Sequence, residues 1–136
     1  MNRRSFIALS SAALVLPTTL AAKALDYRPG MVKERLAAGE TVFVDFTASW
    51  CSTCRTQGRR IEALKKANPA YEQNVTFVDV DWDAYGGGEL SRSLKIPRRS
   101  TLVVLKGDKE LGRIVAQTSE STIKQLMDTA LQAAVA

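Results

Sequence analysis

The chain has 136 residues, of which 46% are hydrophobic, and this length and composition are typical of one domain with its own core. Its formal net charge is +5, but three of its 19 Lys and Arg residues lie in the first 24 residues, which hold no acidic residue, so that 16 basic and 14 acidic residues remain for the rest. This near balance gives no reason to expect a nucleic-acid partner.

The first 24 residues have the pattern of an export signal peptide. Arg3 and Arg4 precede an apolar segment over residues 6–16, and Ala22-Lys23-Ala24 has the small residues of a cleavage site. The two arginines before a bulky apolar pair resemble a twin-arginine signal, with the ordinary secretory route as the alternative. We expect cleavage near Ala24, which would leave a domain over residues 25–136 in a bacterial periplasm or an equivalent compartment.

The rest of the chain alternates apolar runs with turn residues and predicts an α/β fold. After a turn over residues 26–30, the expected elements are a helix over 31–38, a strand over 41–46, a helix over 51–67, a strand over 75–80, a short helix over 89–94, strands over 101–106 and 110–115 joined at Gly107-Asp108, and a last helix over 119–131 with Ser119 as its N-cap. Together they predict a central mixed four-stranded sheet flanked by helices.

The two cysteines of the chain, Cys51 and Cys54, stand two residues apart directly after the first predicted strand. If a helix begins at Cys51, its first sulfur lies at the amino end, where free N–H groups and the helix dipole stabilise a thiolate. Cys51 would then attack the disulfide of a partner, and Cys54, one helical turn along, would resolve the mixed disulfide. This chemistry needs no cofactor.

Two other readings of this cysteine pair are weaker. It could be half of a zinc site, but the chain has no histidine and no further cysteine, so other ligands would have to be carboxylates or come from a second chain. It could also be a static disulfide, but a bridge that closes so short a loop constrains the unfolded chain little. We therefore predict no metal site and a redox role.

The chain resembles the thioredoxin superfamily over nearly all of the region after the signal. The resemblance rests on four segments taken in order: residues 44–51, which lead from a strand into Trp50 and Cys51; residues 77–81; residues 101–106; and residues 119–131. Only the first segment is specific to the superfamily by itself, but the order and spacing of all four segments together are strong evidence for the resemblance. The resemblance implies a thioredoxin-like fold and the activity of a thiol–disulfide oxidoreductase.

The resemblance also implies a role for Asp45, as a buried carboxylate that moves a proton to or from Cys54. A carboxylate in an apolar strand has a raised pKa and could act as an acid or base near neutral pH. The alternative is that Asp45 is only a strand residue whose side chain is satisfied by backbone hydrogen bonds.

Members of the superfamily carry a cis-proline opposite the cysteines, immediately before the strand that begins here at Thr101. Counting back from Thr101 gives Ser100 for that position, whereas Pro97 would require three extra residues. Because a cis bond before a non-proline residue costs about 3–4 kcal/mol, we expect a trans bond before Ser100. The predicted docking surface for a partner protein consists of Trp50, Ser52, Thr53, Arg99, Ser100 and Thr101. For Trp50, filling the core is the alternative.

The residues between the cysteines, Ser52 and Thr53, include no histidine that would further stabilise a thiolate, which favours a reductant. The overall pattern resembles periplasmic reductases, so we expect protein disulfides as substrates, a membrane or periplasmic thiol carrier as the electron donor, and a monomer. The alternative function is a thioredoxin-fold module that binds copper, an iron–sulfur cluster or a partner without catalysis.

Overall fold

The structure is a computed structural model that describes residues 24–136. The export signal expected over residues 1–24 therefore lies, except for Ala24, outside the described residues. Between Ala24 and Ala136, no helix is long and apolar enough to cross a membrane.

The elements follow the predicted order, with three additions. In chain order they are β1 (Leu25–Asp26), α1 (Met31–Ala37), β2 (Thr41–Thr47), α2 (Ser52–Ala67), α3 (Ala70–Asn74), β3 (Thr76–Asp81), α4 (Trp82–Tyr85), α5 (Glu89–Ser93), β4 (Thr101–Lys106), β5 (Lys109–Val115) and α6 (Glu120–Val135). The additions are β1, α3 and α4. Each spans five residues or fewer, which is too short to show a clear apolar periodicity in the sequence.

The sheet formed by the described residues has five strands in the order β1-β3-β2-β4-β5, so the predicted count of four was wrong. The fifth strand arises because Leu25 and Asp26 pair in parallel with Val78 and Asp79 of β3. The central strand β2 pairs in parallel with β3 and antiparallel with β4, and β4 forms the predicted hairpin with β5. The mixed α/β architecture is confirmed.

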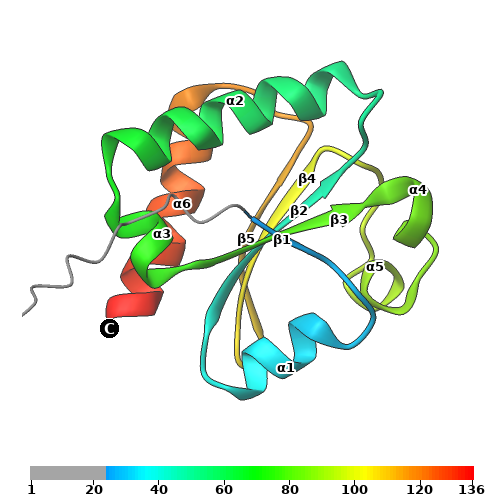
Figure 1. The fold of residues 1–136 in the computed structure, drawn as a ribbon, viewed down its shortest axis with the longest axis horizontal. Helices are drawn as coiled ribbons and strands as arrows, with labels where there is room; N and C mark the ends of the chain where they lie inside the picture. Colours follow the sequence, from blue (N-terminus) through cyan, green and yellow to red (C-terminus); the bar gives the residue numbers. More distant parts are fainter. Residues whose placement is uncertain (1–23) are drawn as a thin grey trace, which may run out of the picture.

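Helices cover both faces of this sheet, as Figure 1 shows, with α2, α3 and α6 on one side and α1, α4 and α5 on the other. Alternation along β2 divides its side chains between the two cores. Val44 and Phe46 lie in the core beneath α1, α4 and α5, whereas Phe43 lies in the core beneath α2, α3 and α6. Asp45 follows Phe43 by two residues and therefore faces α2.

The helix α2 carries the cysteine pair at its amino end and packs on the sheet through one face. Its buried side chains are Cys54, Gln57, Ile61, Leu64 and Lys65. Ile61 and Leu64 thus form the apolar part of this face. Ser119 is the N-cap of α6, as predicted, and its Oγ accepts a hydrogen bond from the backbone N–H of Thr122 at 3.2 Å.

Candidate active site

Cys51 is the N-cap residue of α2, with an extended backbone, so the predicted place of this sulfur at the amino end of the helix is confirmed. Its Sγ accepts a hydrogen bond from the backbone N–H of Cys54 at 3.2 Å. Both cysteines are free thiols and only 3% exposed. Ala48 and the ring of Trp82 pack against them, which limits the approach of solvent to the sulfurs.

Ser100 lies opposite the two sulfurs, immediately before β4, as the count back from Thr101 predicts. Its side chain is completely buried, and its Oγ lies 3.2 Å from Cys51 Sγ and 3.1 Å from Cys54 Sγ. The peptide bond between Arg99 and Ser100 is trans, as expected, and Ser100 has a left-handed backbone with φ of +63°. Pro97 does not occupy this position.

The pKa of Cys51 is lowered from 9.0 to about 7. Burial is the largest influence and raises this pKa, but hydrogen bonds to the sulfur from the Cys54 side chain, the Ser100 hydroxyl, the Cys54 backbone and the Arg99 side chain together outweigh it. Near pH 7 about half of Cys51 is therefore the thiolate, which is the nucleophilic form.

Asp45 lies in the middle of β2, 8% exposed, beside Asp79 of β3. Burial raises its pKa well above the ordinary value of 3.8, the neighbouring Asp79 raises it further, and Lys65 opposes both effects. Among the described residues, none donates a hydrogen bond to its Oδ1, so the alternative of a fully satisfied strand residue does not hold for this oxygen.

Asp45 and Asp79 line a pocket of about 150 Å³ between the sheet and α2, together with Gly58 and Lys65. This volume is large enough to admit water, because one water needs only about 10–15 Å³ of such space. A proton can therefore reach the Asp45 carboxyl group through this pocket without passing through the apolar core.

Lys65 was not recognised from the sequence as part of the site. Its side chain is 3% exposed, and its Nζ lies 3.4 Å from Glu62 Oε1, 4.0 Å from Glu72 Oε1 and 4.1 Å from the centre of the Phe77 ring. This buried cation lowers the pKa of both Asp45 and Asp79. The signal that could have identified it is its spacing of four residues from Ile61, on the apolar stripe of α2.

Trp50 lies on the surface beside the cysteines, with 56% of its area exposed, so it does not fill the core. Its Nε1 donates to both carboxylate oxygens of Asp83, at 3.1 and 3.0 Å. The guanidinium of Arg99 stacks on the indole ring at 4.5 Å from the ring centre. Trp50, Arg99 and Asp83 thus form one connected surface at the rim of the site.

The other residues predicted to dock a partner differ in exposure. Ser52 is exposed and Thr53 half-buried on the first turn of α2, so both are accessible beside the sulfurs. Thr101 is completely buried, and its hydroxyl donates to the backbone carbonyl of Arg98 at 2.7 Å. Its side chain therefore holds the loop before β4, and Ser100 faces the sulfurs.

Gln57 was also not predicted as a site residue, although its side chain holds the loop that carries Ser100. It is completely buried, and its Nε2 donates to the carbonyl of Ser100 at 3.0 Å and to that of Gln117 at 2.9 Å. A polar residue three positions after Cys54, on the apolar face of α2, was the available signal.

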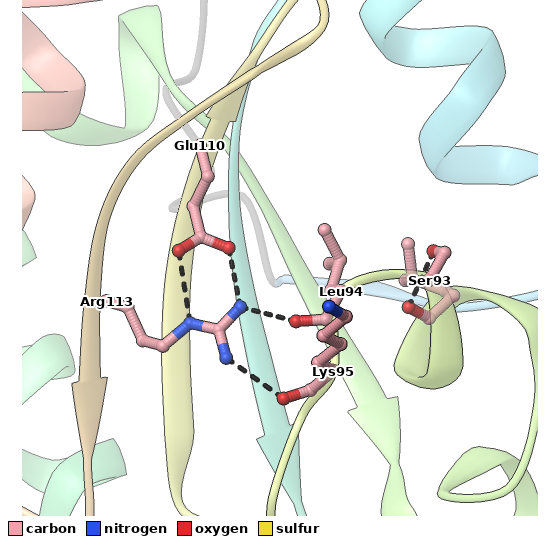
Figure 2. Close-up of polar contacts among 6 residues, drawn as sticks. Ser93, Leu94, Lys95, Glu110 and Arg113 are labelled. Atoms are coloured by element: carbon pink, nitrogen blue, oxygen red, sulfur yellow. Dashed lines mark hydrogen bonds and ion pairs between the residues drawn. The ribbon is translucent and has the colours of Figure 1, made fainter.

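Arg113 holds the start of the same loop. Its guanidinium forms a two-point ion pair with Glu110 and donates to the carbonyls of Leu94 and Lys95, as Figure 2 shows. The segment between α5 and β4 is thus fixed to the hairpin at one end and to α2 at the other.

Within residues 24–136, no three or more His, Cys, Asp or Glu side chains are grouped so that they could hold a metal ion. The arrangement offers a buried thiol that ionises near neutral pH, a second thiol one turn along the helix, and a buried carboxyl group with a raised pKa. The two thiols are the groups that thiol–disulfide exchange requires, and the carboxyl group can act as an acid or base beside them.

The sequence profile of the thioredoxin family matches residues 28–129. Among curated proteins, thioredoxin H-type 1 of Nicotiana tabacum is 30% identical over 103 residues, which cover 76% of this chain and 77% of that protein. Thioredoxin-1 of Saccharomyces cerevisiae is 28% identical over 90 residues, 66% of this chain and 81% of that protein. The crystal structure of Trxlp from Edwardsiella tarda matches with a TM-score of 0.65 and 26% identity, covering 76% of this chain and 98% of that one. The chain therefore belongs to the thioredoxin family of thiol–disulfide oxidoreductases.

Proposed function

We propose that this enzyme reduces disulfide bonds in exported proteins, with Cys51 as the nucleophile and Cys54 as the resolving thiol. The observation that carries this assignment is the position of Cys51 Sγ at the N-cap of α2, where hydrogen bonds lower its pKa to about 7. A thiol with a pKa near the ambient pH is the most effective attacking group, because it combines a large thiolate fraction with retained nucleophilicity.

The reaction proceeds in two exchanges. The Cys51 thiolate attacks one sulfur of the substrate disulfide, the substrate S–S bond breaks, and the other substrate sulfur leaves as a thiolate. Cys54 then loses its proton and attacks Cys51 Sγ, which breaks the mixed disulfide and releases the second substrate sulfur. The substrate gains two electrons, and the enzyme is left with a disulfide between Cys51 and Cys54.

Asp45 is the acceptor for the proton that Cys54 loses in the second exchange. Its buried carboxyl group has a pKa raised well above 3.8, so it can bind and release a proton closer to neutral pH than an exposed aspartate does. The pocket of about 150 Å³ that Asp45 lines gives water a route by which the carboxyl group can afterwards release this proton.

The partner docks over the surface formed by Trp50, Ser52, Thr53 and Arg99. Trp50 offers an exposed aromatic area that is held in place by Asp83 and Arg99. An anchored aromatic side chain binds a partner with little loss of conformational freedom.

The proposed location rests on the sequence. The apolar segment after Arg3 and Arg4 and the cleavage pattern at Ala24 support export to a periplasm, where a membrane or periplasmic thiol carrier would return the two electrons. The first strand of the sheet begins at Leu25, which fits a domain that starts after Ala24. Cell fractionation of the protein with Arg3 and Arg4 intact or replaced by Lys would test the twin-arginine route.

The test of the activity is insulin-disulfide reduction with dithiothreitol as the electron source. We expect Cys51→Ala to abolish turnover, and Cys54→Ala to accumulate a mixed disulfide between Cys51 and the substrate. Ser91→Ala is the matched control, because Ser91 is 2% exposed and its hydroxyl donates to the carbonyl of Tyr85, away from the sulfurs. Turnover by Cys51→Ala would contradict the proposal.

The direction of electron flow is tested by the reduction potential of the cysteine pair. A value near about −270 mV would support a reductase, whereas one near about −120 mV would indicate a disulfide donor. If the protein instead held copper(I) at the cysteines and showed no turnover, the function would be that of a metal-binding module.

A further inference from the structure

The hydroxyl of Ser100 is placed to act on the reacting sulfurs themselves. Its Oγ lies 3.2 Å from Cys51 Sγ and 3.1 Å from Cys54 Sγ, within hydrogen-bond distance of both, and the side chain is completely buried. A serine hydroxyl has one proton to donate and lone pairs to accept, so it can donate to one sulfur while it accepts from the other.

The backbone at Ser100 is built for a residue other than proline. Its N–H donates to the carbonyl of Phe46 at 2.7 Å, and its φ of +63° lies far from the value near −65° that a proline ring fixes. A left-handed conformation is costly for a residue with a Cβ, by about 1–2 kcal/mol, and persists only where the surroundings enforce it.

The surroundings of Ser100 enforce this conformation at several points. Its carbonyl accepts from Gln57 Nε2 at 3.0 Å and from the N–H of Ala116 at 2.9 Å. The hydroxyl of Thr101 closes the loop onto Arg98, and Arg113 clamps the loop at Lys95 (Figure 2). A strained residue fixed this firmly against two reactive sulfurs indicates a functional role for its side chain.

We propose that Ser100 is a further catalytic residue beside Cys51, Cys54 and Asp45, and that its hydroxyl donates a hydrogen bond to the Cys51 thiolate and accepts one from the Cys54 thiol. This inference rests on the proposed function, because it assigns the attacking role to Cys51 and the resolving role to Cys54. The Cys54 thiol has one proton, so it donates either to Cys51 Sγ directly or to Ser100 Oγ. When it donates to Ser100, the hydrogen bonds from Cys54 through Ser100 to Cys51 keep the negative charge on Cys51 and the proton on Cys54 until the substrate is attacked.

A hydrogen bond strengthens when its acceptor is charged, so the hydroxyl stabilises the Cys51 thiolate more than the thiol. The effect agrees in direction with the low pKa of Cys51, to which the Ser100 hydroxyl contributes. Once Cys51 is bonded to the substrate, its sulfur is neutral and accepts more weakly. The hydroxyl then remains in contact with Cys54, the sulfur that must ionise for the second exchange.

The test measures the pKa of Cys51 in the full chain from the pH dependence of its alkylation by iodoacetamide, with fragment-ion mass spectrometry to separate Cys51 from Cys54. We expect Ser100→Ala to raise this pKa by about one unit, because a hydrogen bond to a charged group contributes at least this much. At pH 6 the thiolate fraction would fall about tenfold. The alkylation rate would fall about three- to tenfold, since the remaining thiolate is more nucleophilic.

The variant Ser100→Gly distinguishes the effect of losing the hydroxyl from the effect of backbone strain. Glycine also lacks the hydroxyl but adopts a positive φ without strain, so it should fold at least as well as the wild type and raise the Cys51 pKa as Ser100→Ala does. Ser91→Ala controls for the loss of a buried serine hydroxyl elsewhere and should leave the Cys51 pKa unchanged.

A wild-type Cys51 pKa in Ser100→Gly would overturn the inference, whatever Ser100→Ala shows, because the hydroxyl would then be dispensable. Alkylation requires no turnover, so this result is independent of the proposed function. Suppose that the wild type did not reduce insulin but that its Cys51 pKa was lower than that of Ser100→Gly. The proposed function would then be wrong, and the effect of the hydroxyl on Cys51 would still be supported.

Discussion

Both faces of the sheet are covered by an apolar core, but they differ near the cysteines, where only one face carries buried ionisable side chains. Under α1, α4 and α5, strand β2 presents Val42, Val44 and Phe46, all completely buried. On the face under α2, β2 presents Phe43 but then Asp45, with Asp79 beside it on β3 and Lys65 above it on α2. One face of the strand is therefore built for stability, and the other interrupts its core with ionisable groups next to the cysteines.

This difference separates what holds the domain together from what tunes its chemistry. An apolar side chain stabilises the fold at any pH, whereas a buried carboxyl group costs free energy whenever it is charged. Changes on the apolar face should therefore alter the free energy of unfolding alone. Changes on the polar part of the other face should alter reactivity and the dependence of stability on pH.

Truncation on the apolar face should have the largest effect. Leu105 is 5% exposed at the end of β4, paired with Val42 and away from the sulfurs. We expect Leu105→Ala to lower the free energy of unfolding by about 2–5 kcal/mol, measured by urea denaturation, and to leave the Cys51 pKa unchanged. Val135→Ala, at a position 62% exposed, should change stability by less than about 0.5 kcal/mol. A shifted Cys51 pKa in Leu105→Ala would show that the two faces are not independent.

Asp45→Asn should act in the opposite sense, with a slower reaction and a more stable fold. Without a carboxylate to accept the proton of Cys54, we expect resolution of the mixed disulfide to slow by roughly a hundredfold at pH 7, at the lower end of general-base contributions. Release of the substrate thiol in single-turnover experiments measures this step. An unchanged rate would remove Asp45 from the mechanism.

The same variant should change the dependence of stability on pH. Because the folded pKa of Asp45 is raised above its ordinary value of 3.8, the folded chain holds this proton over a range in which the unfolded chain has lost it. The contribution of Asp45 to the free energy of unfolding is then fully present below about pH 4 and is lost as the pH rises through the folded pKa. Asp79, also raised, contributes in the same direction. Urea denaturation between pH 4 and 6, below the Cys51 pKa of about 7, should show a smaller decline in Asp45→Asn.

Lys65→Met should have the smallest effect of these variants on reactivity. The substitution keeps an apolar stem on the Phe77 ring but removes the cation that lowers the Asp45 pKa. We expect the pH profile of turnover to shift to higher pH and the rate at pH 7 to fall a few-fold. Lys66→Met, on the exposed neighbour, should leave the profile unchanged. If the pH profile of turnover did not shift in Lys65→Met, Lys65 would have no influence on the catalytic role of Asp45.

The sequence predicts those features of this molecule that depend on residues close together in the chain. Three predicted features each depend on a few neighbouring residues: the strand before Cys51, the start of a helix at Cys51 and the N-cap at Ser119. Ser100 could be placed because Thr101 marks the start of a recognisable strand.

The supports of the site could not be predicted, because their partners are distant in sequence. Gln57 contacts Ser100 across 43 positions, and Arg113 contacts Lys95 across 18. Their spacing on the apolar stripe of α2 indicates that Gln57 and Lys65 face the sheet, but only the packed fold shows which groups they contact there. The two-residue strand β1 was missed because its pairing with β3, and not its own sequence, defines it.

The left-handed backbone of Ser100 also limits how this site can change in evolution. A proline at this position would have to turn φ from +63° to about −65° and would give up the N–H that Phe46 accepts. The Gln57 and Ala116 contacts to the Ser100 carbonyl would have to change with it. Replacing Ser100 by proline alone would therefore leave these backbone contacts unmade, so the proline-bearing form of the site requires a rebuilt loop as well as the new residue.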